Sequence, residues 1–252
     1  MKFTLKFAAA LIFPALLAAP TVQAQAVWTG KAELGVLLAS GNTESKSANT
    51  KFDLKRESEK WINTFFVGAL YGENGSFSTA ERYETKYQAD YKINDRLSWF
   101  GALRGEQDRF SGFVYQATAS TGASYKFIDT SITKFQVSLG AGYRRLKNEI
   151  LVKTDAGEVI DRIEGEEESE PVGTLSSDYE HSFTENTKIT NKLLVESGSD
   201  NTALQNDIAL QVSMTKTLAL AVGFGIRYNT DPPALSESTD TLTTINLVYN
   251  IK

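Results

Sequence analysis

The chain has 252 residues, of which 26 are Lys or Arg, 31 are Asp or Glu, one is His and none is Cys, and its formal net charge is −5. An acidic chain has no electrostatic reason to bind nucleic acid, and a chain without cysteine forms neither disulfides nor thiolate metal sites. The length suits a single β domain.

Residues 1–24 have the pattern of a secretory signal peptide. Lys2 and Lys6 precede an apolar run that is too short to cross a bilayer as a helix, and the small residues Ala24 and Ala26 suit a cleavage site. Cleavage after Ala24 or Ala26 removes two basic residues and no acidic ones, so the net charge falls from −5 to −7. We therefore expect one β-barrel domain over residues 25–252.

Beyond the signal, apolar and polar residues alternate with a period of two in long segments, which is the pattern of β-strands. In the first segment Ala32 and Leu34 share one face, while Lys31 and Glu33 share the other. A tilted membrane-crossing strand needs about nine to eleven residues, whereas the usual globular strand has about five or six. We expect strands of the longer kind over residues 28–38, 47–55, 61–71, 83–93, 97–106, 113–127, 134–144, 174–183, 188–196, 204–214, 218–228 and 241–251. The third segment is partly apolar on both faces, so its facing stays open.

The predicted connections alternate in length. Those after even-numbered strands are short, such as residues 94–96 and 184–186, and most of the others are longer and polar. In outer-membrane barrels short turns face the periplasm and long loops face outside. We therefore expect an all-β fold, a single antiparallel up-and-down transmembrane β-barrel of about 12 strands with both termini periplasmic. The largest irregular segment, residues 146–171, is predicted to be a protruding hairpin and loop that ends in the solvated acidic run 164–170.

A soluble barrel or sandwich also alternates, with its apolar face turned inward. Three features favour lipid instead: the strands are long, the centres of the apolar faces lack charged residues, and aromatic residues gather near strand ends. The residues that suit two aromatic girdles are Trp28, Tyr83, Tyr91, Trp99, Phe113, Tyr125, Tyr143, Phe183, Tyr228 and Tyr249.

The opposite faces carry charges of both signs and are predicted to line the lumen. Charges there need water or counter-charges, and a barrel of about 12 strands lies between small filled barrels and open porins. We therefore expect a narrow or plugged lumen. The candidate lumen-lining residues are Lys31, Glu33, Lys51, Asp53, Lys86, Asp90, Arg104, Glu106, Arg144, Asp178, Glu180, Lys192, Asp207 and Arg227.

Catalytic chemistry has little support in the sequence. His181 is the single histidine, and no cluster of nucleophile, base and orienting group is visible around it. The group Glu106 to Arg109 could bind a hard cation through its oxygens, but a loop salt bridge is the favoured interpretation. We expect no catalytic residue, no metal site and no cofactor.

Several segments together resemble a known family. They are residues 38–43 (LASGNT), 104–112 (RGEQDRFSG), 122–125 (GASY), 231–233 (DPP) and 239–249. These segments are similar to those of the salt-induced outer membrane proteins, a bacterial family whose shared domain has no assigned function. The resemblance covers nearly the whole mature chain and implies an outer-membrane β-barrel. The family commonly closes on an aromatic residue, whereas this chain ends in Asn250-Ile251-Lys252.

The leading hypothesis is a non-enzymatic barrel of the bacterial outer membrane, serving envelope integrity or the passage of small solutes. A response to salt is suggested only by the family's name. The expected partners are outer-membrane lipids, lipopolysaccharide and, during insertion, the barrel-assembly machinery; the sequence indicates no oligomeric state. Two alternatives stay open, an outer-membrane lipid-modifying enzyme and a soluble periplasmic barrel that binds a ligand.

Overall fold

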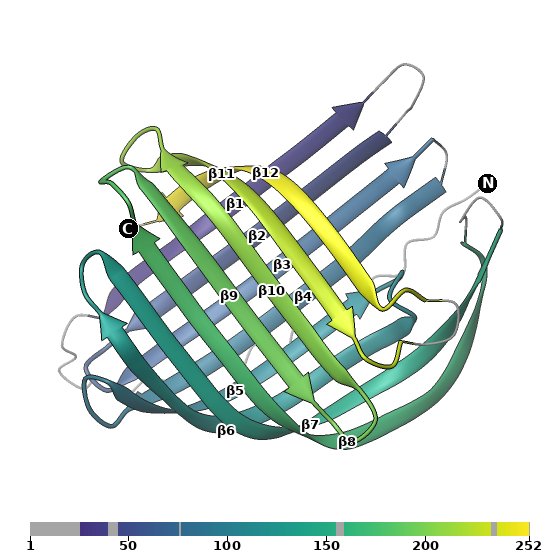
Figure 1. Cartoon of the computed structure of the whole chain (residues 1–252), viewed down its shortest axis with the longest axis horizontal. Coiled ribbons are helices and arrows are strands. Elements are labelled where there is room, and N and C mark those ends of the chain that lie inside the picture. Colours follow the sequence, from purple (N-terminus) through teal and green to yellow (C-terminus); the bar gives the residue numbers. More distant parts are fainter. Residues whose placement is uncertain (1–25, 40–44, 76, 155–158, 233–235, 252) are drawn as a thin grey trace.

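The computed structural model describes residues 26–39, 45–75, 77–154, 159–232 and 236–251. In these residues twelve antiparallel strands form one closed barrel, in which each strand pairs with its neighbours in sequence and β1 pairs with β12 (Figure 1). The predicted fold class is thereby confirmed. No helix within the described ranges is long and apolar enough to cross a membrane. The predicted signal peptide lies outside the described residues.

The strands are between 11 and 24 residues long, as the long alternating segments predict. Connections after even-numbered strands lie at one end of the barrel, here called the turn side, where β1 also begins and β12 ends. Connections after odd-numbered strands lie at the other end, the loop side. The strands are β1 (Val27–Ala39), β2 (Ser45–Glu57), β3 (Trp61–Asn74), β4 (Phe77–Lys92), β5 (Leu97–Asp108), β6 (Phe113–Asp129), β7 (Thr133–Lys153), β8 (Val159–Ser182), β9 (Thr187–Ser197), β10 (Thr202–Ser213), β11 (Leu218–Asn229) and β12 (Thr239–Ile251).

Strands β7 and β8 continue far past their predicted ends and form the longest hairpin of the described barrel (Figure 1). Their pairing runs through Leu146↔Glu168 and Ile150↔Ile163. The prediction of a protruding hairpin is confirmed, but the description of residues 146–171 as irregular is wrong. Oppositely charged side chains pair across these strands, so the strand pattern here is not one of apolar alternation. The sequence Asp155-Ala156-Gly157 predicts a turn within this hairpin, and these three residues lie outside the described ones.

The connection between β3 and β4 is also shorter than expected. The predicted strands over residues 61–71 and 83–93 leave a long connection between them, yet β3 ends at Asn74 and β4 begins at Phe77. Gly75 has a φ of 61°, a left-handed conformation that favours glycine, and this lets the chain reverse within a very short turn. Most of the residues between the two predicted strands therefore belong to β3 and β4.

The outer wall of the barrel is apolar. Large hydrophobic side chains such as Leu34, Leu103, Leu139, Leu220 and Ile245 are exposed on it. By contrast, the cluster of buried hydrophobic residues in the described chain consists of Ala219, Ala221 and Val248. The barrel is thus inside out compared with a soluble β-barrel, an arrangement that is typical of transmembrane barrels.

Strand β3, whose facing the sequence left open, follows the same rule. Phe65 and Val67 are exposed on the outer wall, whereas Ile62, Thr64 and Phe66 border the interior. Apolar residues on both faces of this strand therefore reflect an interior that is locally apolar.

Aromatic side chains form a belt at the turn side. Successive ring contacts join Phe127 to Tyr125 (5.0 Å between centroids) and to Phe135 (5.8 Å), and His181 to Phe183 (5.0 Å). Nine of the ten predicted girdle residues are exposed on the outer wall. The exception is Phe113, which is buried. Its assignment is wrong because the pairing of β6 with β7 shifts register between Phe113 and Tyr115, so strict alternation fails there.

Candidate functional site

The lumen holds the main concentration of charged side chains on the described strands. On the turn side it forms a cavity of about 420 Å³. Nine of the predicted lumen-lining residues border this cavity, namely Lys31, Glu33, Lys51, Asp53, Lys86, Asp90, Asp178, Lys192 and Asp207. Alternation brings them together, because every second residue of a barrel strand points inward.

The remaining predicted residues lie elsewhere. Arg104, Glu106 and Arg227 border a smaller cavity toward the loop side. Arg144 is fully buried and donates hydrogen bonds to Glu170 and to the carbonyl of Asn201 (2.7 Å), so it ties β7 to β8 and to the β9–β10 connection.

Glu180, the last of the predicted set, pairs with Lys188 (2.8 Å) near the turn end of β8 and β9. Neither Arg144 nor Glu180 borders the cavities described here.

Between the two ends, side chains from strands that are not neighbours meet inside the barrel. We call this group the charge bridge and define it as Glu84, Arg104, Glu196, Gln205 and Arg227. Arg104 on β5 donates to Glu84 on β4 (3.2 Å) and to Glu196 on β9 (3.2 Å). Arg227 on β11 donates to Glu84 (3.4 Å), and Gln205 on β10 joins Arg104 (3.3 Å) to Glu84 (3.4 Å). Opposite walls of the barrel are thereby connected toward the loop side.

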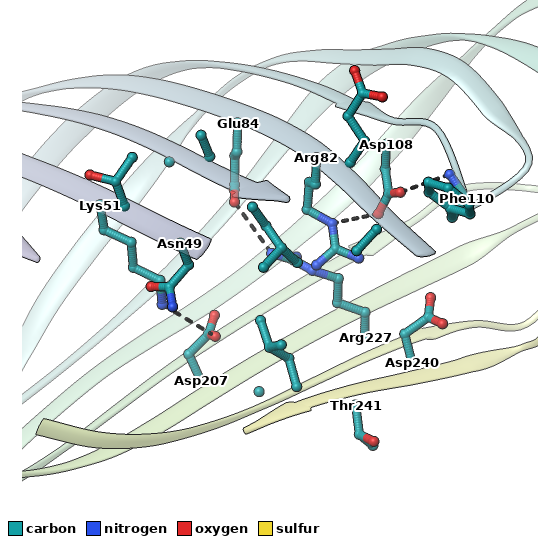
Figure 2. Close-up of a pocket in the computed structure, with 18 of the residues that line it drawn as sticks. Asn49, Lys51, Arg82, Glu84, Asp108, Phe110, Asp207, Arg227, Asp240 and Thr241 are labelled. Carbon is teal, nitrogen blue, oxygen red and sulfur yellow. Dashed lines mark hydrogen bonds and ion pairs between the residues drawn. The ribbon is translucent and has the colours of Figure 1, made fainter. Parts of the chain in front are cut away.

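Two further ion pairs cross the lumen nearer the turn side. Lys192 on β9 lies 3.3 Å from Asp53 on β2, and Lys51 on β2 lies 4.0 Å from Asp207 on β10. Figure 2 shows the Lys51–Asp207 pair beside the contact between Glu84 and Arg227. These pairs narrow the space on the turn side of the charge bridge.

Toward the loop side, Arg82 continues the network. Its guanidinium pairs with Asp108 and lies 3.8 Å from Glu106, while Asp108 also accepts a hydrogen bond from the backbone of Phe110 (3.0 Å) (Figure 2). Arg109 pairs with Glu81 (3.3 Å). The three charged residues of the Glu106 to Arg109 group are therefore ion-paired. No group of metal-ligating side chains occurs in the part of the chain that the structure describes.

Charge is distributed unevenly along the lumen. The large turn-side cavity is bordered by six lysines and six acidic residues, so its lining is neutral overall. The two cavities toward the loop side are together bordered by four basic and seven acidic residues. An acidic mouth raises the local concentration of cations over anions.

Sequence reasoning missed several members of this site. Arg82 falls just before the predicted start of its strand at Tyr83, so its facing was not assigned. Continuing the period of two from Glu84 would have placed it inward. Gln205 was passed over because the candidates were chosen by charge, although its position on β10 shares the inward face with Asp207.

The His181 ring lies in the aromatic belt. Its Nδ1 shares a hydrogen bond of 2.8 Å with the Thr133 hydroxyl, and the ring lies between those of Tyr179 and Phe183. Such an environment is that of an interfacial polar side chain among aromatic neighbours.

Comparison with known proteins gives relatives of similar length. The uncharacterized protein YdiY of Escherichia coli (strain K12) is 27% identical over 228 residues, which cover 88% of this chain and 82% of that protein. Among solved structures, the NanC porin is similar with a TM-score of 0.45 and 12% identity over 89% of this chain and 98% of that one. An outer membrane channel from Pseudomonas putida F1 is similar with a TM-score of 0.47 and 7% identity over 95% and 100%. The family described as "Protein of unknown function, DUF481" matches residues 32–251, and the chain therefore belongs to that family.

Proposed function

We propose that this protein is a non-enzymatic β-barrel of the bacterial outer membrane whose narrow, charge-bridged lumen admits ions and small solutes and excludes larger molecules. The observation that supports this most directly is the charge bridge, which joins β4, β5, β9, β10 and β11 inside the barrel. Support for the membrane placement comes from the closed ladder of strands, which leaves the backbone paired around most of the wall, and from the apolar outer face.

A bridge of this kind obstructs the lumen. Aqueous porin channels are built from about 16 to 18 strands, whereas smaller barrels are largely filled by side chains. Here Arg104 and Arg227 reach acidic and amide groups of distant strands at hydrogen-bonding distance, so the middle of the lumen is occupied. Any path is limited to gaps between these side chains.

The acidic lining toward the loop side favours cations in such a path. A role in envelope integrity or in the passage of small cationic solutes follows.

The two alternatives have weaker support. A lipid-modifying enzyme needs a nucleophile activated by a base that a third group orients; the Thr133–His181 pair has aromatic rings where that third group would stand. A soluble barrel with an apolar ligand needs its hydrophobic side chains inside, opposite to the arrangement of Leu34 and Leu220.

Other expectations from the sequence stay part of this proposal. They are periplasmic termini, contact with lipopolysaccharide, and insertion by the barrel-assembly machinery. Induction by salt rests on the resemblance alone. A transcript level that does not change at raised salt would remove salt induction from the proposal.

The test is single-channel conductance in planar bilayers, comparing the wild type with the double variant Arg104→Ser, Glu196→Ser. The pair of substitutions leaves the net charge unchanged, and Glu84 keeps Arg227 while Glu106 keeps Arg82. We expect small or absent steps for the wild type and larger, cation-preferring steps for the variant.

The matched control is Lys188→Ser, Glu180→Ser. It removes an ion pair of 2.8 Å between the neighbouring strands β8 and β9, which does not cross the lumen. Its conductance should equal that of the wild type. Wide, stable steps in the wild type, unchanged in the Arg104 and Glu196 variant, would contradict a lumen closed by the charge bridge.

A further inference from the structure

The seam that closes the barrel is paired over only part of its length. β1 pairs with β12 from Gly30↔Ile251 to Leu34↔Leu247. In contrast, β1 pairs with β2 along its whole length, and β12 pairs with β11 from Thr239 to Tyr249. On the loop side of Leu34, β1 and β12 therefore separate, and Figure 1 shows the two strands diverging from their common end.

The unpaired backbone edges of β1 and β12 at this gap are unfavourable in contact with lipid tails. Residues 35–39 of β1 and 239–246 of β12 have no pairing with each other in the described chain. Backbone N–H and C=O groups on an open strand edge need a polar partner inside a membrane, because lipid tails offer none. These edges therefore need polar partners that the pairing of β1 with β12 does not supply.

Unsatisfied side-chain groups mark the point at which the strands separate. Asn246 is buried and donates to Glu33 (2.9 Å), but its Oδ1 has no hydrogen-bond partner in the described chain, and neither has the buried Oδ1 of Asn49. Both amide groups lie against Gly35, where an added Cβ would collide with the two side chains. The Oδ1 of Asn246 lies beside Gly35, the first residue of β1 past its paired part, and has no donor in the described chain.

A cavity of about 210 Å³ lies behind the gap. It is bordered by residues of β2, β3, β4, β5, β10, β11 and β12 but by no described residue of β1, although β1 stands between β2 and β12 in the barrel. Its border includes Thr50 on β2 and Thr241 on β12. The cavity thus reaches the strands on both sides of β1.

The outer wall also changes character beside the gap. The exposed residues of β12 there are Thr239, Thr241 and Thr243, whereas Ile245 and Leu247 further along the same face are apolar. A polar stretch on a lipid-facing surface is where a headgroup or water is tolerated.

We propose that this gap is a lateral portal through which a zwitterionic amphiphile with a single acyl chain enters the cavity from the bilayer. The headgroup and the first part of the acyl chain would enter the cavity, while the rest of the tail would remain beside the outer wall. This inference rests on the proposed membrane placement and does not depend on conduction through the lumen.

The lining of the cavity fits this class of ligand. Lys51 and Arg227 bring positive charge, and Asp207 and Asp240 bring negative charge, so both ends of a zwitterion meet an opposite sign (Figure 2). Phe66, Leu70 and Leu242 add apolar surface for the first part of a chain. The volume is below the roughly 300 to 1,000 Å³ of sites that enclose drug-sized ligands, so a headgroup and the beginning of one chain fit, but a whole phospholipid does not.

The absence of native cysteine makes a site-specific test possible. A Leu242→Cys variant is labelled with a small fluorophore and reconstituted into phosphatidylcholine vesicles. Lysophosphatidylcholine that carries bromine on the first part of its acyl chain, next to the headgroup, quenches fluorescence on contact and is then titrated in. Leu70→Cys gives a second position in the same cavity. The matched control is Leu194→Cys, an interior position on β9 that borders the lumen away from the gap.

The portal predicts a saturable loss of fluorescence at positions 242 and 70 and none at 194. Equal quenching at all three positions would mean entry through the ends of the lumen, and no quenching at 242 and 70 would mean that the wall is closed; either result overturns the portal. Flotation of the protein with the vesicles is measured in the same samples. A protein that does not float with the vesicles would overturn the membrane placement as well. A protein that floats but shows no quenching at positions 242 and 70 overturns the portal alone.

Discussion

At the residue scale, Arg104 illustrates how charge is tolerated inside the barrel. Its guanidinium donates to Glu84, Glu106, Glu196 and Gln205, which come from four different strands. A guanidinium presents five N–H donors in one plane, so it can bind several carboxylates at once, whereas a lysine ammonium cannot reproduce that geometry. The desolvation cost of each charge is thus offset by several partners.

The substitutions Leu220→Arg and Val222→Arg test whether these two side chains face outward. Both side chains are exposed on the apolar wall of β11, where a charge would have to enter lipid. Each substitution should destabilise the folded barrel by about 2 to 4 kcal/mol if the site lies near the bilayer midplane.

Unfolding by urea in vesicles measures this cost, with Val222→Leu as the conservative control. Wild-type stability and normal membrane assembly of both arginine variants would show that these side chains do not face lipid.

The facing of most residues could be predicted because a period of two assigns every side chain of a strand once a few are fixed. It failed at Phe113, beside a shift of register, and at Arg82, beyond a predicted strand end. The partners of Arg104 could not be predicted at all. Which inward residues meet depends on how strands far apart in sequence face each other after closure, and alternation contains no information on that.

At the element scale, the β7–β8 hairpin is held by contacts of its own beyond the barrel. Leu146 and Leu151 are buried. Arg162 pairs with Glu149 (2.7 Å) and donates to the carbonyl of Arg109 (2.7 Å), so the hairpin packs against the β5–β6 connection. This connection ends at Gly112, whose φ of 80° favours glycine.

The acidic run on this hairpin is exposed at residues 164–169, in agreement with the prediction that it is solvated, and several of its members are also paired. Glu164 pairs with Lys147, Glu167 with Arg145, and Glu170 with Arg144. These pairs could not be predicted from the composition of the run, because the basic partners lie on the opposite strand.

This pairing predicts acid sensitivity of the hairpin. The hydrogen bond from Arg145, followed by that from Tyr115 (2.8 Å), holds the pKa of Glu167 below its ordinary value of 4.5. A lowered pKa in the folded state means that the stabilisation is complete above pH 4.5 and is lost as the pH falls through the folded value.

Amide hydrogen-exchange protection of the hairpin should therefore decrease in the acid range below pH 4.5, while that of β2 stays constant. Glu167→Gln should weaken this pH dependence, and Glu185→Gln, in the exposed turn between β8 and β9, should leave it unchanged. Equal acid sensitivity in both variants would assign the effect to other groups.

At the scale of the whole molecule, the barrel separates two environments. Its outer wall is apolar with an aromatic belt at the turn side, and its interior is charged and bridged. Strand number and fold class could be predicted because long alternating segments and short turns recur along the entire chain. The incomplete seam between β1 and β12 could not, since pairing of the first and last strands is a property of closure and leaves no local pattern in either strand.

The central claim, that the apolar wall faces lipid, is tested most directly by tryptophan fluorescence. The three tryptophans of the chain, Trp28, Trp61 and Trp99, are exposed on the outer wall by 51%, 47% and 53%. In vesicles of brominated phospholipid their emission should be strongly quenched and, in unbrominated vesicles, shifted to shorter wavelength than in the unfolded chain. Emission of the folded protein that is indifferent to brominated lipid would contradict a lipid-facing wall.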